Sequence, residues 1–222
     1  MTDATRPPVR PMSPHRLVAF LTHTLAARQP GQVLRVAIDG APPADPGALA
    51  DTLLDPLRAA GRPALRVPAA GFLRPTSLRW ERCRTEPDSL YEDWLDLGAL
   101  RREVLAPLAP GGNGAYLPAL WDPLLDRSAR QRRTPAPPGA VVVVDGSFLL
   151  GCGLPFDLTV HLHLSPAALR RRLPPDLRWT EPAYARYEAE ASPASIADIV
   201  VGVDDPRHPA LIRAAPGPVD WT

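Results

Sequence analysis

The chain of 222 residues carries 25 basic and 24 acidic residues, a formal charge of +1, so it lacks the positive surplus with which nucleic-acid-binding domains attract phosphate. Its 45% hydrophobic fraction and its 22% charged fraction exclude a disordered chain. Every basic residue is arginine, which excludes mechanisms that need lysine, such as Schiff-base chemistry and the phosphate-binding lysine of an ordinary P-loop.

The first 70 residues alternate between helical and extended patterns. Ser13 followed by Pro14 is typical of a helix cap with a proline in the first turn, and the apolar residues after it recur at helical spacing. An apolar run closed by Asp39-Gly40 indicates a buried strand. We expect a flexible arm over 1–13, helices over 14–28 and about 46–60, and strands over 34–38 and 64–68.

The rest of the chain repeats this alternation after a long stretch rich in arginine and proline. Four consecutive valines closed by Asp145-Gly146 indicate the clearest buried strand. Helices are expected over 88–95, 98–106, 166–173 and 182–190, and strands over 141–144, 158–164 and 199–201. Strands alternating with helices predict an α/β fold with a parallel five-stranded sheet, whose ligands bind beyond the carboxyl ends of the strands.

The turn after the first strand has the position, but not the residues, of a phosphate-binding loop. The pattern G-x-x-x-x-G-K-[ST], counted from Gly40, is broken by Asp45, Pro46 and Gly47 at its last three positions. Three positions from 41 to 46 are prolines, which lack the N–H groups that such a loop directs at phosphate. We expect Asp45 to cap the next helix and occupy its positive end. Alternatively, 39–53 is a proline-rich turn unrelated to nucleotide binding.

Several segments match a known family by their order and spacing, although no single segment is specific. They are VAIDG at 36–40, LAD at 49–51, GFLRP at 71–75, VDGSFLL at 144–150 and ADIVV at 197–201. Over about 34–211 the chain resembles the uridine kinase-like branch of the P-loop nucleoside kinases. The resemblance implies a three-layer αβα P-loop NTPase-like fold in one domain over 14–222, with a substrate-side insertion at about 72–135 and a shortened lid at about 166–195.

The same resemblance identifies what this chain lacks. The family's base aspartate falls on Ala70, its phosphate-binding lysine on Pro46 and its magnesium-binding hydroxyl on Gly47. Phosphoryl transfer depends on positioning and charge neutralisation, and loss of one charge-stabilising group commonly costs ~10²–10³ in rate. The three losses together predict no kinase activity by the usual route.

Residues on the substrate side match the family better. The resemblance implies that Phe72, Asp96 and Tyr116 contact a nucleoside, although Asp96 could instead cap a helix and the aromatic residues could belong to the core. Asp145 matches the acidic end of a Walker B-like strand, or is only a turn residue. The lid arginines, expected either to clamp phosphates or to form a solvated helix face, are Arg170, Arg171, Arg178 and Arg186.

His161 and His163 point to the same face of a predicted strand, a spacing that could supply two metal ligands. No third ligand is evident beside them in the sequence, and a half-polar strand face explains both. We therefore expect no metal site.

Three hypotheses for the function follow. The first, which we favour, is a catalytically degenerate uridine kinase-like protein that binds a nucleoside, a nucleotide or a protein partner without a cofactor. The second is a divergent nucleoside phosphotransferase that uses ATP and magnesium, with Arg35, Arg74 or Arg186 in place of the lysine. The third is a structural partner protein whose cleft is filled. Without a signal-peptide core or long apolar runs, we expect a cytoplasmic protein that binds neither nucleic acid nor membranes.

Overall fold

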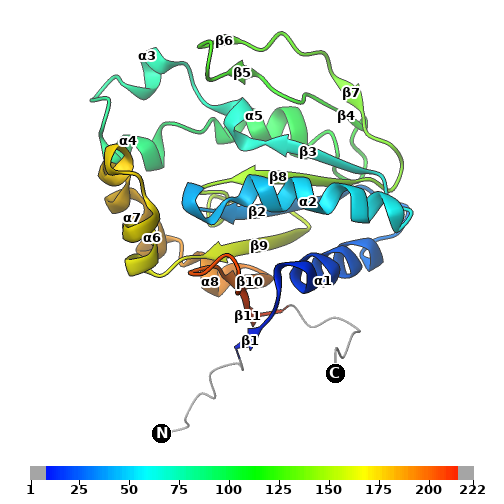
Figure 1. Ribbon diagram of the computed structural model, residues 1–222. Helices are drawn as coiled ribbons and strands as arrows, with labels where there is room; N and C mark the ends of the chain where they lie inside the picture. The colour runs from blue at the N-terminus through cyan, green and yellow to red at the C-terminus, as the bar shows by residue number, and fades with distance from the viewer. Residues whose placement is uncertain (1–8, 215–222) are drawn as a thin grey trace, which may run out of the picture.

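The structure, a computed structural model, describes residues 9–214 and has a sheet between two layers of helices (Figure 1). The strands of this sheet are β1 Arg10–Pro11, β2 Leu34–Gly40, β3 Ala64–Pro68, β8 Val141–Gly146, β9 Leu158–His163, β10 Ile199–Gly202 and β11 Ala210–Arg213. Five of them are parallel in the order β10-β9-β2-β8-β3, which confirms the predicted sheet. The antiparallel strands β11 and β1 extend it beyond β10.

The beginning of the chain differs from the flexible arm expected over 1–13. Residues 1–8 lie outside the part that the structure describes. Arg10 and Pro11 form β1, which pairs with Leu211 and Ala210. The expectation is wrong for these two residues, because a two-residue strand has no periodicity from which it could be predicted.

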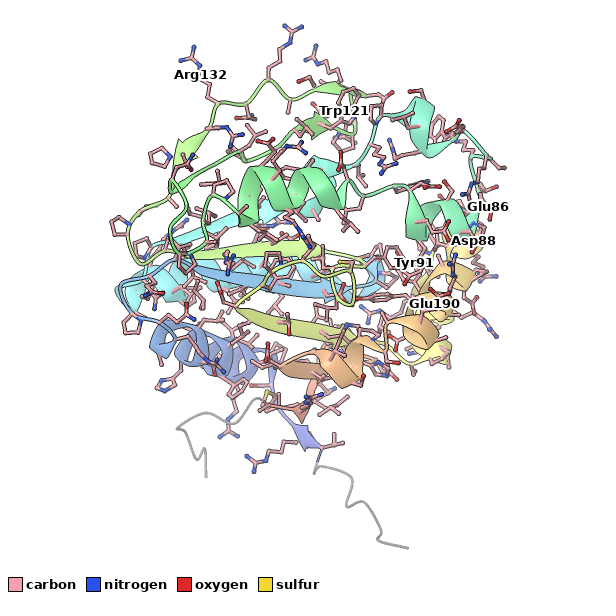
Figure 2. The ribbon with its side chains drawn as sticks, turned by 180° about the vertical axis from the view of Figure 1, so that it is seen from behind. Glu86, Asp88, Tyr91, Trp121, Arg132 and Glu190 are labelled. Carbon is pink, nitrogen blue, oxygen red and sulfur yellow. The ribbon has the colours of Figure 1, made fainter. Side chains whose placement is uncertain are left out.

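Helices cover both faces of the sheet. Helices α1 and α2 lie on the face seen in Figure 1, and α5 and α8 lie on the opposite face, which is turned to the viewer in Figure 2. The helices are α1 Pro14–Ala27, α2 Pro46–Ala59, α3 Thr76–Arg79, α4 Pro87–Glu92, α5 Leu97–Leu100, α6 Pro166–Arg172, α7 Glu181–Glu190 and α8 Pro193–Ile196. A π-helical turn, Arg101–Leu105, continues α5. Within residues 9–214, no helix is long and apolar enough to cross a membrane.

The hydrophobic core lies where the central strands meet the helices. The four valines of β8 and the residues Leu21 and Leu25 of α1 are fully buried. Burial on both faces explains why these strands are continuous apolar runs rather than alternating ones.

Between β3 and β8 the chain leaves the sheet. This segment holds α3, α4, α5 and two short hairpins, which Figure 1 shows beyond the β3 edge. The hairpins pair β4 Ala115–Tyr116 with β7 Thr134–Pro135, and β5 Trp121–Asp122 with β6 Arg127–Ser128.

The register of the central strands brings polar side chains together at their carboxyl ends. Ile38 of β2 is opposite Asp145 of β8, and Asp39 is opposite His161 of β9. Pro68 at the end of β3 is also opposite Asp145. These strand ends, together with α4, α6 and α7, form the part of the molecule where a ligand is expected.

Candidate functional site

The turn after β2 is folded on itself. Residues Pro42–Ala44 form a 3₁₀ turn, and the N–H groups of Ala44 and Asp45 donate to the carbonyls of Ala41 and Pro42 at 2.8 and 3.0 Å. With the three prolines, five of the seven backbone positions from 41 to 47 have no N–H or use it inside the turn. The turn therefore cannot direct a series of N–H groups at phosphate oxygens.

Asp45 caps α2, as predicted. Its backbone has φ +56°, the left-handed conformation that aspartate tolerates better than most residues, and its Oδ1 accepts a hydrogen bond from the Ala48 N–H at 3.1 Å. Pro46 follows at the first helical position. A carboxylate therefore occupies the positive end of the helix.

A guanidinium group fills the space beside Gly47. Arg66 of β3 makes a bidentate ion pair with Asp145, Nε to Oδ1 at 2.7 Å and Nη2 to Oδ2 at 2.9 Å, and its Nη1 donates to Asp51 Oδ2 at 2.7 Å. The hydrogen bond with Asp145 is the main reason why the pKa of Arg66 is raised above its ordinary value. A Cβ atom at position 47 would lie 2.6 Å from Arg66 Nη2.

The charges around Gly47 sum to a negative value. Arg66 contributes one positive charge, and Asp51 and Asp145 contribute two negative charges in direct contact with it. Asp45 adds a further negative charge at the start of α2. The residues that resemble a phosphate and magnesium site therefore do not fit a triphosphate, because a guanidinium occupies the corner and the surrounding charge is anionic.

A second arginine connects the turn to α6. Arg172, the last residue of α6, donates to the carbonyl of Val203 at 2.6 Å and also to the carbonyl of Pro43. Ser147 Oγ donates to the Gly40 carbonyl at 2.8 Å from the other side. The turn is therefore held in place by side chains of two neighbouring elements.

Three of the four arginines expected to clamp phosphates contact other protein groups in this structure. Arg170 pairs with Glu181 at 2.6 Å, and Arg171 donates to the Asp204 carbonyl at 3.5 Å. Arg178 is exposed. Arg186 is held by three carboxylates at 2.7 to 3.0 Å, those of Asp88, Glu92 and Glu190.

Two of the arginines that we considered as lysine replacements are also engaged elsewhere. Arg35 forms a buried ion pair with Asp157 at 2.6 Å, and Arg186 is held as described above. Arg74 is exposed. The arginines that reach the turn are Arg66 and Arg172, which the sequence analysis did not single out for this role.

A cavity of about 400 Å³ lies between the turn, the end of β3, α4 and α7. Gly47, Arg66 and Asp145 line one part of it, and the rest of the wall is largely apolar or aromatic. The apolar and aromatic lining includes Leu73, Leu90, Trp94, Leu95, Phe148 and Tyr184. Its volume is in the range of small-molecule sites, which are mostly apolar with a few polar groups.

Phe148 has a strained backbone at the wall of this cavity. Its φ is +63°, a conformation that is an outlier for a bulky residue. Its ring stacks on Tyr184, with centroids 5.0 Å apart, and meets Tyr91 and Tyr187 edge to face. Such strain persists only where the surrounding packing fixes it, and it often marks a ligand site.

The residues predicted to contact a nucleoside do not line this cavity. Phe72 is fully buried in the core and Tyr116 is 5% exposed. Asp96 caps α5, its Oδ1 accepting from the Ala99 N–H at 2.8 Å. The structure thus places these three residues as the structural alternatives expect, in the core and at a helix cap, and their contact with a nucleoside stays a prediction.

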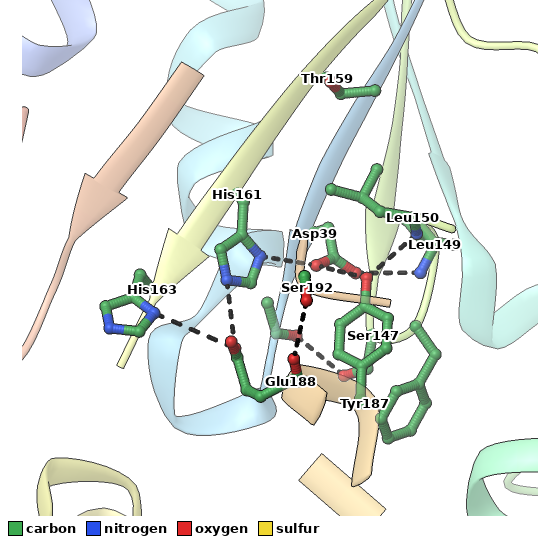
Figure 3. A network of polar contacts seen from close by, with 12 residues as sticks. Asp39, Ser147, Leu149, Leu150, Thr159, His161, His163, Tyr187, Glu188 and Ser192 are labelled. Atoms are coloured by element: carbon green, nitrogen blue, oxygen red, sulfur yellow. Dashed lines mark hydrogen bonds and ion pairs between the residues drawn. The ribbon is translucent and has the colours of Figure 1, made fainter. Parts of the chain in front are cut away.

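A buried polar network joins the carboxyl ends of β2 and β9 (Figure 3). Asp39 is fully buried and accepts from His161 Nδ1 at 2.7 Å, from the Tyr187 hydroxyl at 3.1 Å and from the Leu149 N–H at 2.9 Å. Burial lowers the pKa of His161, but the carboxylates of Asp39 and Glu188 outweigh it and raise the pKa to about 9. Burial and then Asp39 raise the pKa of Tyr187, so its hydroxyl remains a donor.

No protein-family model matches this chain, and the search of curated proteins found no match. Two solved structures share its fold. A candidate uridine kinase from Bacillus stearothermophilus is 19% identical with a TM-score of 0.69, the match covering 84% of this chain and 97% of that one. A candidate fructose transport system kinase from Silicibacter sp. TM1040 is 25% identical with a TM-score of 0.58, covering 84% and 95%.

These comparisons agree with the resemblance seen in the sequence. Both neighbours match nearly their whole length, so the likeness extends over the domain and is not limited to one motif. The chain therefore has the three-layer fold of the P-loop kinases, with a turn after β2 that departs from the phosphate-binding sequence of that fold.

Proposed function

We propose that this protein binds a neutral nucleoside in the cavity beside Arg66 and does not transfer phosphate to it from ATP. One observation carries this proposal: the Arg66 guanidinium, paired with Asp145 and Asp51, takes the space beside Gly47. A serine or threonine side chain at position 47 would collide with the Arg66 guanidinium. A ligand group placed beside Gly47 would collide with it as well.

The cavity itself favours an uncharged ligand with a flat ring. Trp94, Phe148 and Tyr184 supply aromatic surface, and Asp145 and Arg66 supply a small polar area. The excess of carboxylates near Gly47 disfavours phosphate groups. The name of the uridine kinase neighbour makes uridine the first ligand to test.

The divergent phosphotransferase is the alternative, because Arg66 is an arginine within reach of the turn. Its Nε, Nη1 and Nη2 groups, however, all donate to carboxylates. A guanidinium already neutralised in this way has little charge left to offer a phosphate. The structural protein with a filled cleft has less support, since the cavity of about 400 Å³ remains.

Calorimetry with uridine, UMP and ATP, with and without magnesium, tests the proposal together with an assay of ADP formation. We expect saturable binding of uridine, weaker binding of UMP, and no ADP formation that depends on uridine. Absence of uridine binding would remove the ligand assignment, and uridine-dependent ADP formation would establish the phosphotransferase instead.

A matched pair of variants locates the binding. Ala70 is exposed and lines the cavity, so Ala70→Trp should obstruct it with little effect on the core and weaken uridine binding at least tenfold. Leu78 is 49% exposed and is not among the residues that line this cavity, so Leu78→Trp should leave the affinity unchanged. Equal affinities for the two variants would place the ligand elsewhere.

A further inference from the structure

Two histidines and a glutamate converge at the end of β9 (Figure 3), which lies on the opposite side of β2 from β8. His161 and His163 lie on the same face of β9, and Glu188 comes from α7. One nitrogen of each ring and one carboxylate oxygen all lie within 4.8 Å of one another. The sequence analysis found no third ligand, because Glu188 is distant in the sequence and meets the strand only when the lid folds over it.

The two ring nitrogens that face this point are buried without hydrogen-bond partners. His161 Nε2 lies 3.5 Å and His163 Nδ1 lies 4.0 Å from the same oxygen, Glu188 Oε1. Neither nitrogen makes a hydrogen bond, and both atoms are inaccessible to solvent. The His161 side chain is only 4% exposed. Buried polar atoms are nearly always paired, so their convergence here indicates a ligand that the three atoms share.

Asp39 fixes the orientation of His161. Its Oδ2 accepts a hydrogen bond from His161 Nδ1 at 2.7 Å, and Asp39 also accepts hydrogen bonds from the Tyr187 hydroxyl and the Leu149 N–H. The other ring nitrogen, Nε2, is thereby presented to Glu188. A carboxylate that holds the far nitrogen of a histidine is the usual support of a metal-binding imidazole, because it fixes the ring and makes it a better ligand.

We propose that His161 Nε2, His163 Nδ1 and Glu188 Oε1 form a binding site for a divalent transition metal ion of the zinc type. Tetrahedral coordination with bonds of ~2.0–2.1 Å places ligand atoms about 3.4 Å apart. The ring nitrogens lie 3.5 and 4.0 Å from Glu188 Oε1 and within 4.8 Å of each other, so coordination requires an adjustment that brings the three groups closer. His163 and Glu188 are 32% and 41% exposed, so their side chains can make it.

The site borders a cavity of about 220 Å³ that is lined by His161, Glu188, Tyr184 and the turn residues Gly40 and Ala41. Three protein ligands leave one tetrahedral position open, and this cavity provides room for a water molecule or a small oxygen ligand there. The set of two imidazoles and one carboxylate favours zinc or a neighbouring transition metal over magnesium or calcium, which prefer oxygen ligands alone.

The same geometry has a simpler interpretation, in which a protonated His161 forms ion pairs with Asp39 and Glu188 and binds no metal. The two interpretations predict different results when metal binding is measured.

In the test, metals are first removed with a chelator, and the full chain is then titrated with Zn²⁺ by calorimetry and with Co²⁺ by visible absorption. A site with two histidines and a carboxylate should bind one ion per chain and give the d–d bands of low-coordinate cobalt.

The variants His163→Ala and Glu188→Gln should each weaken Zn²⁺ binding at least about tenfold and abolish the cobalt bands. Both residues are partly exposed, so the fold should survive, which circular dichroism checks. His15→Ala is the matched control, because His15 is exposed on α1, and it should bind Zn²⁺ as the unchanged chain does. Lack of stoichiometric binding, or equal binding by all three variants, would overturn the proposal in favour of the ion pair.

Discussion

The Arg66 guanidinium occupies the space that a side chain at position 47 would need, at the start of α2. A Cβ atom at position 47 would be 2.6 Å from Arg66 Nη2 and 3.3 Å from Asp145 Oδ2, both closer than ordinary packing allows. Because Arg66 is held by two carboxylates, its end cannot move aside without breaking ion pairs. Position 47 therefore requires glycine, because Arg66 leaves no room for a Cβ atom. Alanine would otherwise be preferred, since it stabilises a helix by ~1 kcal/mol relative to glycine.

This requirement predicts the result of a double-mutant cycle. Gly47→Ala should lower the free energy of unfolding by about 1–2 kcal/mol in the natural chain, because overpacking displaces Arg66. In an Arg66→Ala background the same change should be neutral or stabilising. Urea unfolding of the four proteins measures the coupling free energy, and additive effects would show that Arg66 does not occupy the space beside Gly47.

Asp45 combines a helix cap with a left-handed backbone. Asp45→Ala should lower the free energy of unfolding by about 1–2 kcal/mol, since it loses the hydrogen bond to the Ala48 N–H and strains the backbone. Asp45→Asn is the control, because asparagine caps equally well and tolerates positive φ, and it should cost only a few tenths of a kcal/mol. Equal losses for the two variants in thermal or urea unfolding would contradict the assigned cap.

At the scale of helices and strands, the sequence was most informative where patterns are long. The two central strands, β2 and β8, are largely apolar and are closed by Asp39-Gly40 and Asp145-Gly146, so their burial and their termination could both be predicted. Helices α1 and α2 start with a cap and a proline, which fixed their first residues. The strands β4 to β7 have two residues each, which is too short for a hydrophobic periodicity, and nothing in the sequence indicated them.

The candidate site was less predictable because its groups come from distant segments. Asp45 acts through its sequence neighbours, and its role as a cap could be inferred. Arg66 meets Asp145 only because β3 and β8 are adjacent in the sheet, 79 positions apart in sequence. Glu188 reaches His161 and His163 only through the packing of α7. Such contacts depend on register and on packing, which a single sequence does not specify.

Arg62 joins α1 to the segment before β8, at the end of the sheet opposite the candidate site. This buried side chain donates to the carbonyls of Ala26, Arg28 and Gly139 at 2.7 to 2.9 Å, and to that of Gln32 at 3.4 Å. It thereby joins the end of α1 to the segment before β8. A single guanidinium thus donates hydrogen bonds to four carbonyl groups.

Arg62→Ala should lower the free energy of unfolding by roughly 2–4 kcal/mol, because buried acceptors lose charged donors. Arg62→Lys keeps the charge but not the planar fork, and should recover only part of this loss. Uridine binding should be unchanged in both variants when measured below their unfolding transitions. A loss below 1 kcal/mol for the alanine variant would contradict the structural role given to Arg62.

At the scale of the whole molecule, the fold of the P-loop kinases is retained while its central charge arrangement is changed. The sheet order places Asp39 and Asp145 at neighbouring strand ends. On one side Asp145 is neutralised by Arg66, and on the other Asp39 supports His161. Phe148 lines two cavities, and we have proposed a neutral ring as the ligand of one and a metal ion beside the other.

The most direct test of this account is the titration of the natural chain with Mg-ATP by calorimetry, with uridine as the positive reference. Because protein charges fill the corner beside Gly47, we predict no saturable binding of Mg-ATP at concentrations where uridine binds. The combined variant Asp45→Gly, Pro46→Lys, Gly47→Thr and Arg66→Ala removes Arg66 and Asp45 and restores the lysine and hydroxyl of the phosphate-binding pattern, so it should have a higher affinity for Mg-ATP. Stoichiometric binding of Mg-ATP by the natural chain would contradict the account.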